Sequence, residues 1–103
     1  MSRRASKVDA NQAQIVSALE AAGATVQSLA PIGKGCPDLL VAAPRKEYFN
    51  GKADVGMFLL EIKNKDGKDE VNAAQQKWHI EWNAPVYVVY GPEEALRVIG
   101  ARK

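Results

Sequence analysis

Two short acidic motifs flank apolar segments of the chain. Asp38, which follows a proline, opens the apolar run 39–43; Glu61 lies near the end of the apolar run 57–62, and Lys63 follows two residues later. Carboxylates that lie close together repel each other unless a cation sits between them, and such oxygen ligands suit Mg²⁺ or Mn²⁺. A nearby lysine can orient or activate a water molecule. Together these groups could hydrolyse a phosphodiester bond.

The elements that would position these groups can be predicted from periodicity and from chain-breaking residues. We expect a helix that begins after Asp9 or Asn11 and ends before Gly23. Further helices are predicted over 73–82 and 92–99, strands over 25–29, 39–43, 57–62 and 86–90, and a polar connection over 44–56. The first three strands can form a meander, and the helix at 73–82 can serve as a crossover between parallel strands. The predicted fold class is therefore α/β, a mixed sheet flanked by helices.

Antiparallel pairing of the second and third strands would bring Asp38 beside Glu61, give or take one residue of register. Glu61 and Lys63 are two residues apart and share a face, whereas Leu60 and Ile62 point to the opposite face and can serve the core. A simpler interpretation also exists. Lys63 could merely neutralise one of the carboxylates in an ion pair at the end of the sheet, since Glu-x-Lys alone is a weak motif.

The length of 103 residues predicts a single domain over 1–103, with residues 1–8 as a basic, flexible tail. The net charge of +2 gives no strong overall attraction to nucleic acid. Local basic clusters, such as the one formed by Lys63, Lys65 and Lys68, could meet a phosphate backbone or simply be solvated.

Cys36 is the single cysteine, so neither an intramolecular disulfide nor a cysteine-rich zinc site can form. A reducing, cytoplasmic setting fits this usage. No apolar stretch approaches the ~20 residues that span a bilayer, and no long apolar segment follows the basic N-terminus. We therefore expect neither a membrane span nor a secretory signal.

Three segments together resemble the PD-(D/E)xK nuclease superfamily: 35–41, with sequence GCPDLLV, 60–63, with sequence LEIK, and Gln75 ahead of a Trp-His pair. Within it, the chain is most similar to small VRR-NUC and phage-type, Holliday-junction-resolvase-like nucleases, over about 9–96. The resemblance implies a restriction-endonuclease-like αβββαβ core, dependence on a divalent metal, and DNA as the substrate. It also suggests a bacterial or phage-infected host cell.

Site roles follow from the same resemblance. Asp38, Glu61 and the backbone carbonyl of Ile62 would hold the metal. Lys63 would orient the attacking water and stabilise charge that develops on the phosphate. Gln75 would support the site and complete the catalytic group.

The chain departs from the family pattern on the first helix. Many relatives carry a glutamate there, and the corresponding position lies close to the neutral Gln12. Asp9 or Glu20 could replace it only if the path of the helix allows. The absence of a third carboxylate would weaken metal binding.

Other residues have less specific interpretations. Lys34, Lys65 and Lys68 are candidate phosphate contacts. Trp78 and Trp82 share a helix face and could stack on unpaired bases, although a role in covering the sheet is favoured. His79 is similarly interpreted as a packing or surface residue, and Cys36 as a small filler.

The predicted function is that of a Mg²⁺- or Mn²⁺-dependent endodeoxyribonuclease, with branched or junction DNA as a candidate substrate. A homodimer is expected, because cutting both strands of a junction requires two sites. The alternative is a non-catalytic DNA-binding or interaction module that retains the nuclease fold. A metabolic α/β enzyme is disfavoured, since no cofactor fingerprint is present.

Overall fold

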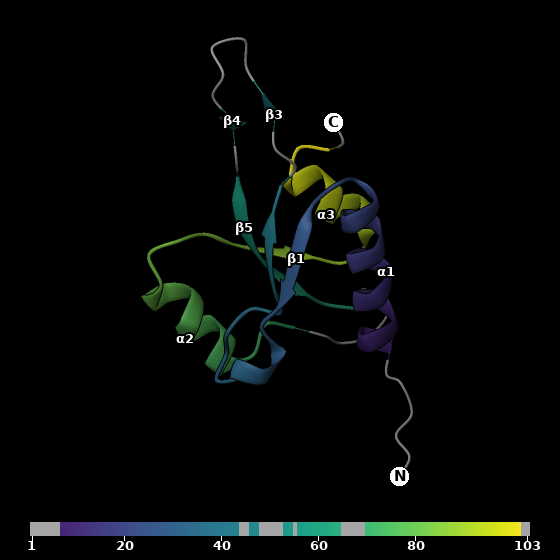
Figure 1. The fold of residues 1–103 in the computed structure, drawn as a ribbon. Coiled ribbons are helices and arrows are strands. Elements are labelled where there is room, and N and C mark those ends of the chain that lie inside the picture. The colour runs from purple at the N-terminus through teal and green to yellow at the C-terminus, as the bar shows by residue number, and fades with distance from the viewer. Residues whose placement is uncertain (1–6, 44–45, 48–52, 55, 65–69, 102–103) are drawn as a thin grey trace.

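A central sheet separates two helices on one side from a third helix on the other (Figure 1). The computed structural model describes the backbone of 7–43, 46–47, 53–54, 56–64 and 70–101, and the side chains of 10–43, 56–64 and 70–101. The elements in chain order are α1 (Lys7–Ala21), β1 (Thr25–Ser28), the 3₁₀ turn η1 (Ala30–Ile32), β2 (Leu39–Ala42), β3 (Lys46–Glu47), β4 (Ala53–Asp54), β5 (Met57–Ile62), α2 (Ala73–Glu81), β6 (Val86–Val89) and α3 (Pro92–Val98).

The main sheet has the strand order β1-β2-β5-β6. The pairs β1/β2 and β2/β5 are antiparallel, with Leu39 opposite Leu60, and β5/β6 is parallel, with α2 as the crossover. This arrangement confirms the predicted α/β class, the meander and the crossover. The sequence did not predict β3 and β4, which form a separate two-stranded ladder within the expected connection 44–56.

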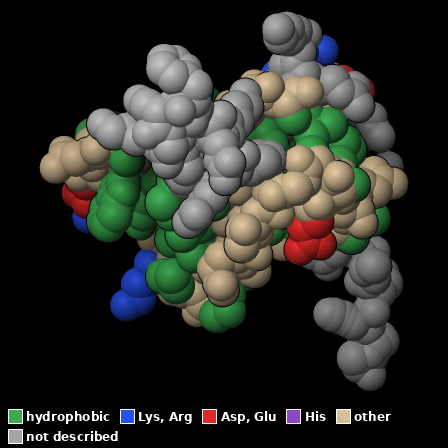
Figure 2. Space-filling view, turned by 45° about the horizontal axis from the view of Figure 1, so that its top comes forward, with side chains coloured by type: hydrophobic (Ala, Val, Ile, Leu, Met, Phe, Trp, Pro, Cys, Tyr) green, Lys and Arg blue, Asp and Glu red, His purple; other side chains and the backbone are tan. Residues whose placement is uncertain are grey.

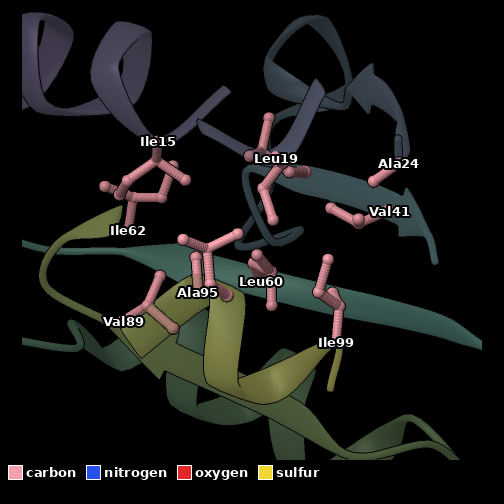
Figure 3. Close-up of a cluster of buried hydrophobic side chains, with 11 residues drawn as sticks. Ile15, Leu19, Ala24, Val41, Leu60, Ile62, Val89, Ala95 and Ile99 are labelled. Carbon is pink, nitrogen blue, oxygen red and sulfur yellow. The ribbon is translucent and has the colours of Figure 1, made fainter. Parts of the chain in front are cut away.

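The hydrophobic core lies between the sheet and the pair α1 and α3 (Figure 3). Ile15 and Leu19, four residues apart on α1, are fully buried against strand residues that include Leu60 and Ile62. Because side chains alternate along a strand, the burial of Leu60 and Ile62 in this core turns Glu61 and Lys63 to the opposite face of the sheet. The core therefore fixes the face on which the candidate site forms.

Of the helices that the structure describes, α2 lies on that opposite face, and none of its nine residues is buried. Trp78 and Trp82 stack with ring centroids 4.6 Å apart, but Trp82 remains 54% exposed. The prediction that these tryptophans cover the sheet as core is therefore wrong for Trp82. Hydrophobic side chains gather on the left of Figure 2, the side on which α2 lies in Figure 1.

The first helix begins at Lys7, inside the segment expected to be a tail, and residues 1–6 lie outside the described part of the chain. Among the described helices, none has both the length and the apolar character needed to cross a bilayer.

Candidate functional site

Asp38 lies where β2 begins, beside the end of β5. Its backbone N–H donates to the Leu60 carbonyl at 3.0 Å, and its Oδ2 atom accepts a 2.6 Å hydrogen bond from the N–H of Ile62. A carboxylate that accepts from a backbone N–H makes a short, charge-assisted hydrogen bond, which fixes its orientation. Because the N–H and C=O of a strand residue point to the same side, the Ile62 carbonyl also faces this side of β5. The structure thus brings Asp38 next to the residue that follows Glu61.

Glu61 and Lys63 are both buried, with exposed fractions of 1% and 6%. Charged groups are rarely buried unless they are paired and hydrogen-bonded. Lys63 Nζ lies 3.9 Å from Glu61 Oε2, and the side-chain amide of Gln75 bridges the two. Gln75 Nε2 donates to Glu61 Oε2 at 2.8 Å, while Gln75 Oε1 accepts from Lys63 Nζ at 2.9 Å. The three predicted residues therefore form one hydrogen-bonded unit.

The same glutamine also starts α2. Asn72 accepts from the Gln75 N–H at 2.9 Å, and Gln75 Oε1 accepts from the Asn72 N–H at 3.0 Å, which completes a capping box. Only an amide can accept from both the lysine and the cap while donating to Glu61. The beginning of α2 and the buried charges of β5 are consequently held by one side chain.

The loop before Asp38 supports this helix end. Gly35 has φ +83°, and a Cβ atom at this position would overlap the backbone carbonyl oxygen of Ala74. Glycine is therefore required twice over, for its left-handed backbone and for its close approach to α2. Lys34 also has a positive φ of 58° and is exposed, so it is available to solvent or to a phosphate. The other two predicted phosphate contacts, Lys65 and Lys68, lie outside the described residues.

Asn11 of the first helix contributes a side-chain amide at this edge of the sheet. Asn11 Nδ2 donates to the carbonyls of Lys63 and Tyr90, both at 3.1 Å, and so ties the ends of β5 and β6 to α1. Glu20 is exposed and lies nine residues farther along, about 13 Å at 1.5 Å per residue. The structure therefore does not bring Glu20 to the site. Gln12 is half-buried, and the side chain of Asp9 is outside the described residues.

His79 reaches the site from α2, since its Nε2 atom lies 3.6 Å from Glu61 Oε1. Burial, followed by the positive charge of Lys63, lowers the pKa of His79 below its usual value. Its Nε2 atom is buried and has no hydrogen-bond partner among the described residues. The interpretation of His79 as a packing or surface residue missed this contact. The signal was its spacing of four residues from Gln75, which places both on one helix face.

The pKa of the Cys36 thiol reflects the negative charge of the site. Burial raises the pKa of its thiol above the usual value, and Glu61 and Asp38 raise it further. Both carboxylates are thus close enough to act on one sulfur atom. The thiol is partly exposed and free.

The oxygen donors at this edge fit a hard divalent cation better than a soft one. No group of three or more His, Cys, Asp and Glu side chains within the described ranges could hold a metal ion. Mg²⁺, however, commonly uses only one or two carboxylates and retains several waters. Asp38, Glu61 and the carbonyl of Ile62 could supply two carboxylates and one carbonyl oxygen, and the Asp38 carboxylate is oriented by the Ile62 N–H.

No protein-family model, curated protein or solved structure matches the chain.

Proposed function

We propose that the protein is a Mg²⁺- or Mn²⁺-dependent endodeoxyribonuclease with a restriction-endonuclease-like αβββαβ core of the PD-(D/E)xK type. The observation that carries this proposal is the burial of Glu61 and Lys63 on one strand face, linked by Gln75 and beside Asp38. An ion pair that served stability alone would be an expensive choice here, because a buried pair often contributes no more than apolar residues of the same volume. A functional role explains why both charges are retained.

Each residue has a distinct part in the proposed reaction. Asp38, Glu61 and the Ile62 carbonyl would hold the cation, which supplies Lewis-acid stabilisation of charge on the phosphate when bound. Lys63 would position the attacking water and donate a hydrogen bond to the developing negative charge. Gln75 holds the Lys63 ammonium at 2.9 Å and so fixes its direction. In-line attack of water on phosphorus would break the bond to the 3′ oxygen, which leaves 5′-phosphate and 3′-hydroxyl ends.

The test is cleavage of linear, flapped and four-way branched DNA with Mg²⁺ or Mn²⁺. Asp38→Asn and Lys63→Ala should abolish cleavage. The control variants are Glu20→Gln, which neutralises an exposed carboxylate, and Lys77→Ala, which removes an exposed lysine; both should cleave like the wild type. Circular dichroism would verify that every variant is folded. Cleavage that survives both site substitutions would contradict the proposal.

A second candidate is a DNA-binding module without catalysis. It is favoured by α1, which supplies the amide of Asn11 to backbone carbonyls where an acidic ligand is expected. Tight binding of branched DNA without cleavage under any metal condition would support this candidate.

We also propose that the nuclease acts as a homodimer, because cutting both strands requires two sites. A monomeric mass by light scattering would count against it.

A further inference from the structure

An apolar cavity of about 410 Å³ is lined in part by Leu40 and Leu59, which lie on the same face of the sheet as Glu61. Its volume falls within the roughly 300–1,000 Å³ typical of small-molecule sites. The lining residues are Leu40, Met57, Phe58, Leu59, Trp82, Ala84, Pro85 and Tyr87, none of which carries a charge. The cavity is therefore unsuited to a phosphate group but suited to a flat, apolar one.

The floor of this cavity continues directly from the candidate site. Leu40 and Leu59 are opposite each other in the β2/β5 ladder, and Leu59 precedes Glu61 by two residues. Residues two apart on a strand share a face and are separated by about 7 Å. This is close to the reach of one nucleotide in an extended DNA strand. A strand with its phosphate at Glu61 would thus have its next base over Leu59.

The wall of the cavity is an exposed indole. Trp82 lies seven residues after Gln75, about 10 Å farther along α2 at 1.5 Å per residue. The helix therefore runs from the buried charges at its beginning to the cavity at its end. Trp82 is held from behind by its stacked partner Trp78, at an interplanar angle of 19°, and is 54% exposed. A rigid, half-exposed aromatic ring of this kind is a platform for an unpaired base.

We propose that this cavity binds one unpaired nucleobase of the DNA substrate, stacked on Trp82 and adjacent to the scissile phosphate. The inference rests on the proposed nuclease function and narrows its substrate to DNA with an unpaired nucleotide beside the cut, such as a flap or a junction branch. The indole N–H of Trp82 and the hydroxyl of Tyr87 are the hydrogen-bonding side-chain groups in this lining, so stacking rather than readout of base edges dominates recognition. Base pairing in a continuous duplex keeps the base out of the cavity.

The test compares two flapped DNA strands of one sequence, in which the junction fixes the register; one is intact and the other has a single abasic nucleotide placed at successive positions beside the junction. Binding is followed by tryptophan fluorescence in Mg²⁺-free buffer. Stacking on an aromatic side chain accounts for about 5- to 150-fold in affinity per base, so the abasic strand should bind more weakly by that factor. Trp82→Ala should remove the difference between the two strands, and Trp82→Phe should restore it. The strand comparison on wild-type protein remains decisive if Trp82→Ala fails to fold.

The outcomes separate this inference from the proposed function. In one outcome, flap cleavage is lost in Asp38→Asn and yet is insensitive to an abasic nucleotide at every position near the cut. That result would contradict base binding in the cavity and would still support the proposed nuclease activity. Binding that depends on the base, without cleavage under any metal condition, would support base binding in the cavity and contradict the proposed nuclease activity. The cavity could instead be covered by a second copy of the chain. In that case Trp82→Ala would convert a dimer into a monomer in sedimentation velocity, and the intact and abasic strands would bind equally. That result would overturn the inference.

Discussion

Replacing Gln75 with alanine removes three hydrogen bonds at once: those to Lys63 Nζ, to Glu61 Oε2 and to the Asn72 N–H. Hydrogen bonds to charged groups contribute about 1.5–3 kcal/mol each, and loss of a helix cap costs about 1 kcal/mol. Part of this loss is recovered, because Lys63 and Glu61 are 3.9 Å apart and can close on each other. We expect the free energy of unfolding to fall by about 2–4 kcal/mol.

The matched control variant is Gln76→Ala, one position later on α2. Gln76 is exposed and donates a single hydrogen bond, to the Val71 carbonyl at 3.0 Å. Its loss should change stability by no more than about 0.5–1 kcal/mol. Urea unfolding and thermal unfolding measure both variants. For a chain of this length the Gln75→Ala loss corresponds to a decrease of about 10–20 °C in melting temperature.

A third variant separates the cap from the charges. Gln75→Glu keeps an acceptor for the lysine and for the cap, but it replaces the donor to Glu61 with an oxygen at a separation of 2.8 Å. Two carboxylates at this distance repel strongly, so Gln75→Glu should be destabilised despite its intact capping box. The reasoning is refuted if Gln75→Ala loses no more stability than Gln76→Ala.

Three further predictions concern the neighbours of this unit. Gly35→Ala should destabilise the protein by more than 1 kcal/mol, measured by urea unfolding, because the new Cβ meets the Ala74 carbonyl oxygen; an unchanged midpoint would contradict the close contact. Cys36 should react slowly with iodoacetamide near pH 8, since burial and two carboxylates raise the pKa of its thiol. A Mg²⁺ ion bound to these carboxylates should offset their charge and accelerate the reaction. Equal rates with Mg²⁺ and with EDTA would count against cation binding at this site. Burial and the charge of Lys63 lower the pKa of His79 in the folded protein. As the pH falls below about 6.5, the unfolded chain therefore protonates its histidine before the folded protein does, and the free energy of unfolding decreases. His79→Gln should therefore show a shallower decline in unfolding free energy from pH 7.5 to 5 in EDTA, and an unaltered slope would oppose this assignment.

The sequence predicted the fold well where local signals agree with the tertiary arrangement. The predicted strand 57–62 matches β5 to the residue, and Gly23, with φ 97°, follows the end of α1 as expected for a C-cap. The short strands β3 and β4 were missed because two-residue ladders carry no periodicity. The exposure of Trp82 was missed for a different reason: a tryptophan pair on one helix face looks the same in sequence whether or not the sheet extends beneath it.

In the candidate site, too, local patterns were predictable from the sequence, whereas contacts between distant segments were not. Glu61 and Lys63 could be placed on one face from strand alternation alone, opposite to Leu60 and Ile62. Their burial depends on what lies over that face, where Gln75 of α2 contacts both side chains. The approach of Asp38 depended on register, which the sequence gives only to within a residue. Gln75 was assigned by resemblance, whereas its hydrogen bonds to both charges depend on how α2 sits over the sheet.

Asn11 of α1 holds the backbone of the lysine in the candidate site. Its side-chain amide donates to the carbonyl of Lys63, whose own N–H donates to Val89 on β6 at 3.0 Å, so the backbone of the lysine is held from two sides. A carboxylate at Asn11 could not donate these hydrogen bonds, and it would face two carbonyl oxygens instead. The role of α1 is thus to fix the backbone from which Lys63 projects toward Gln75. Among the described side chains of α1, Asn11 acts on the backbone of the lysine, and the carboxylate of Glu20 is too far along the helix to reach the site.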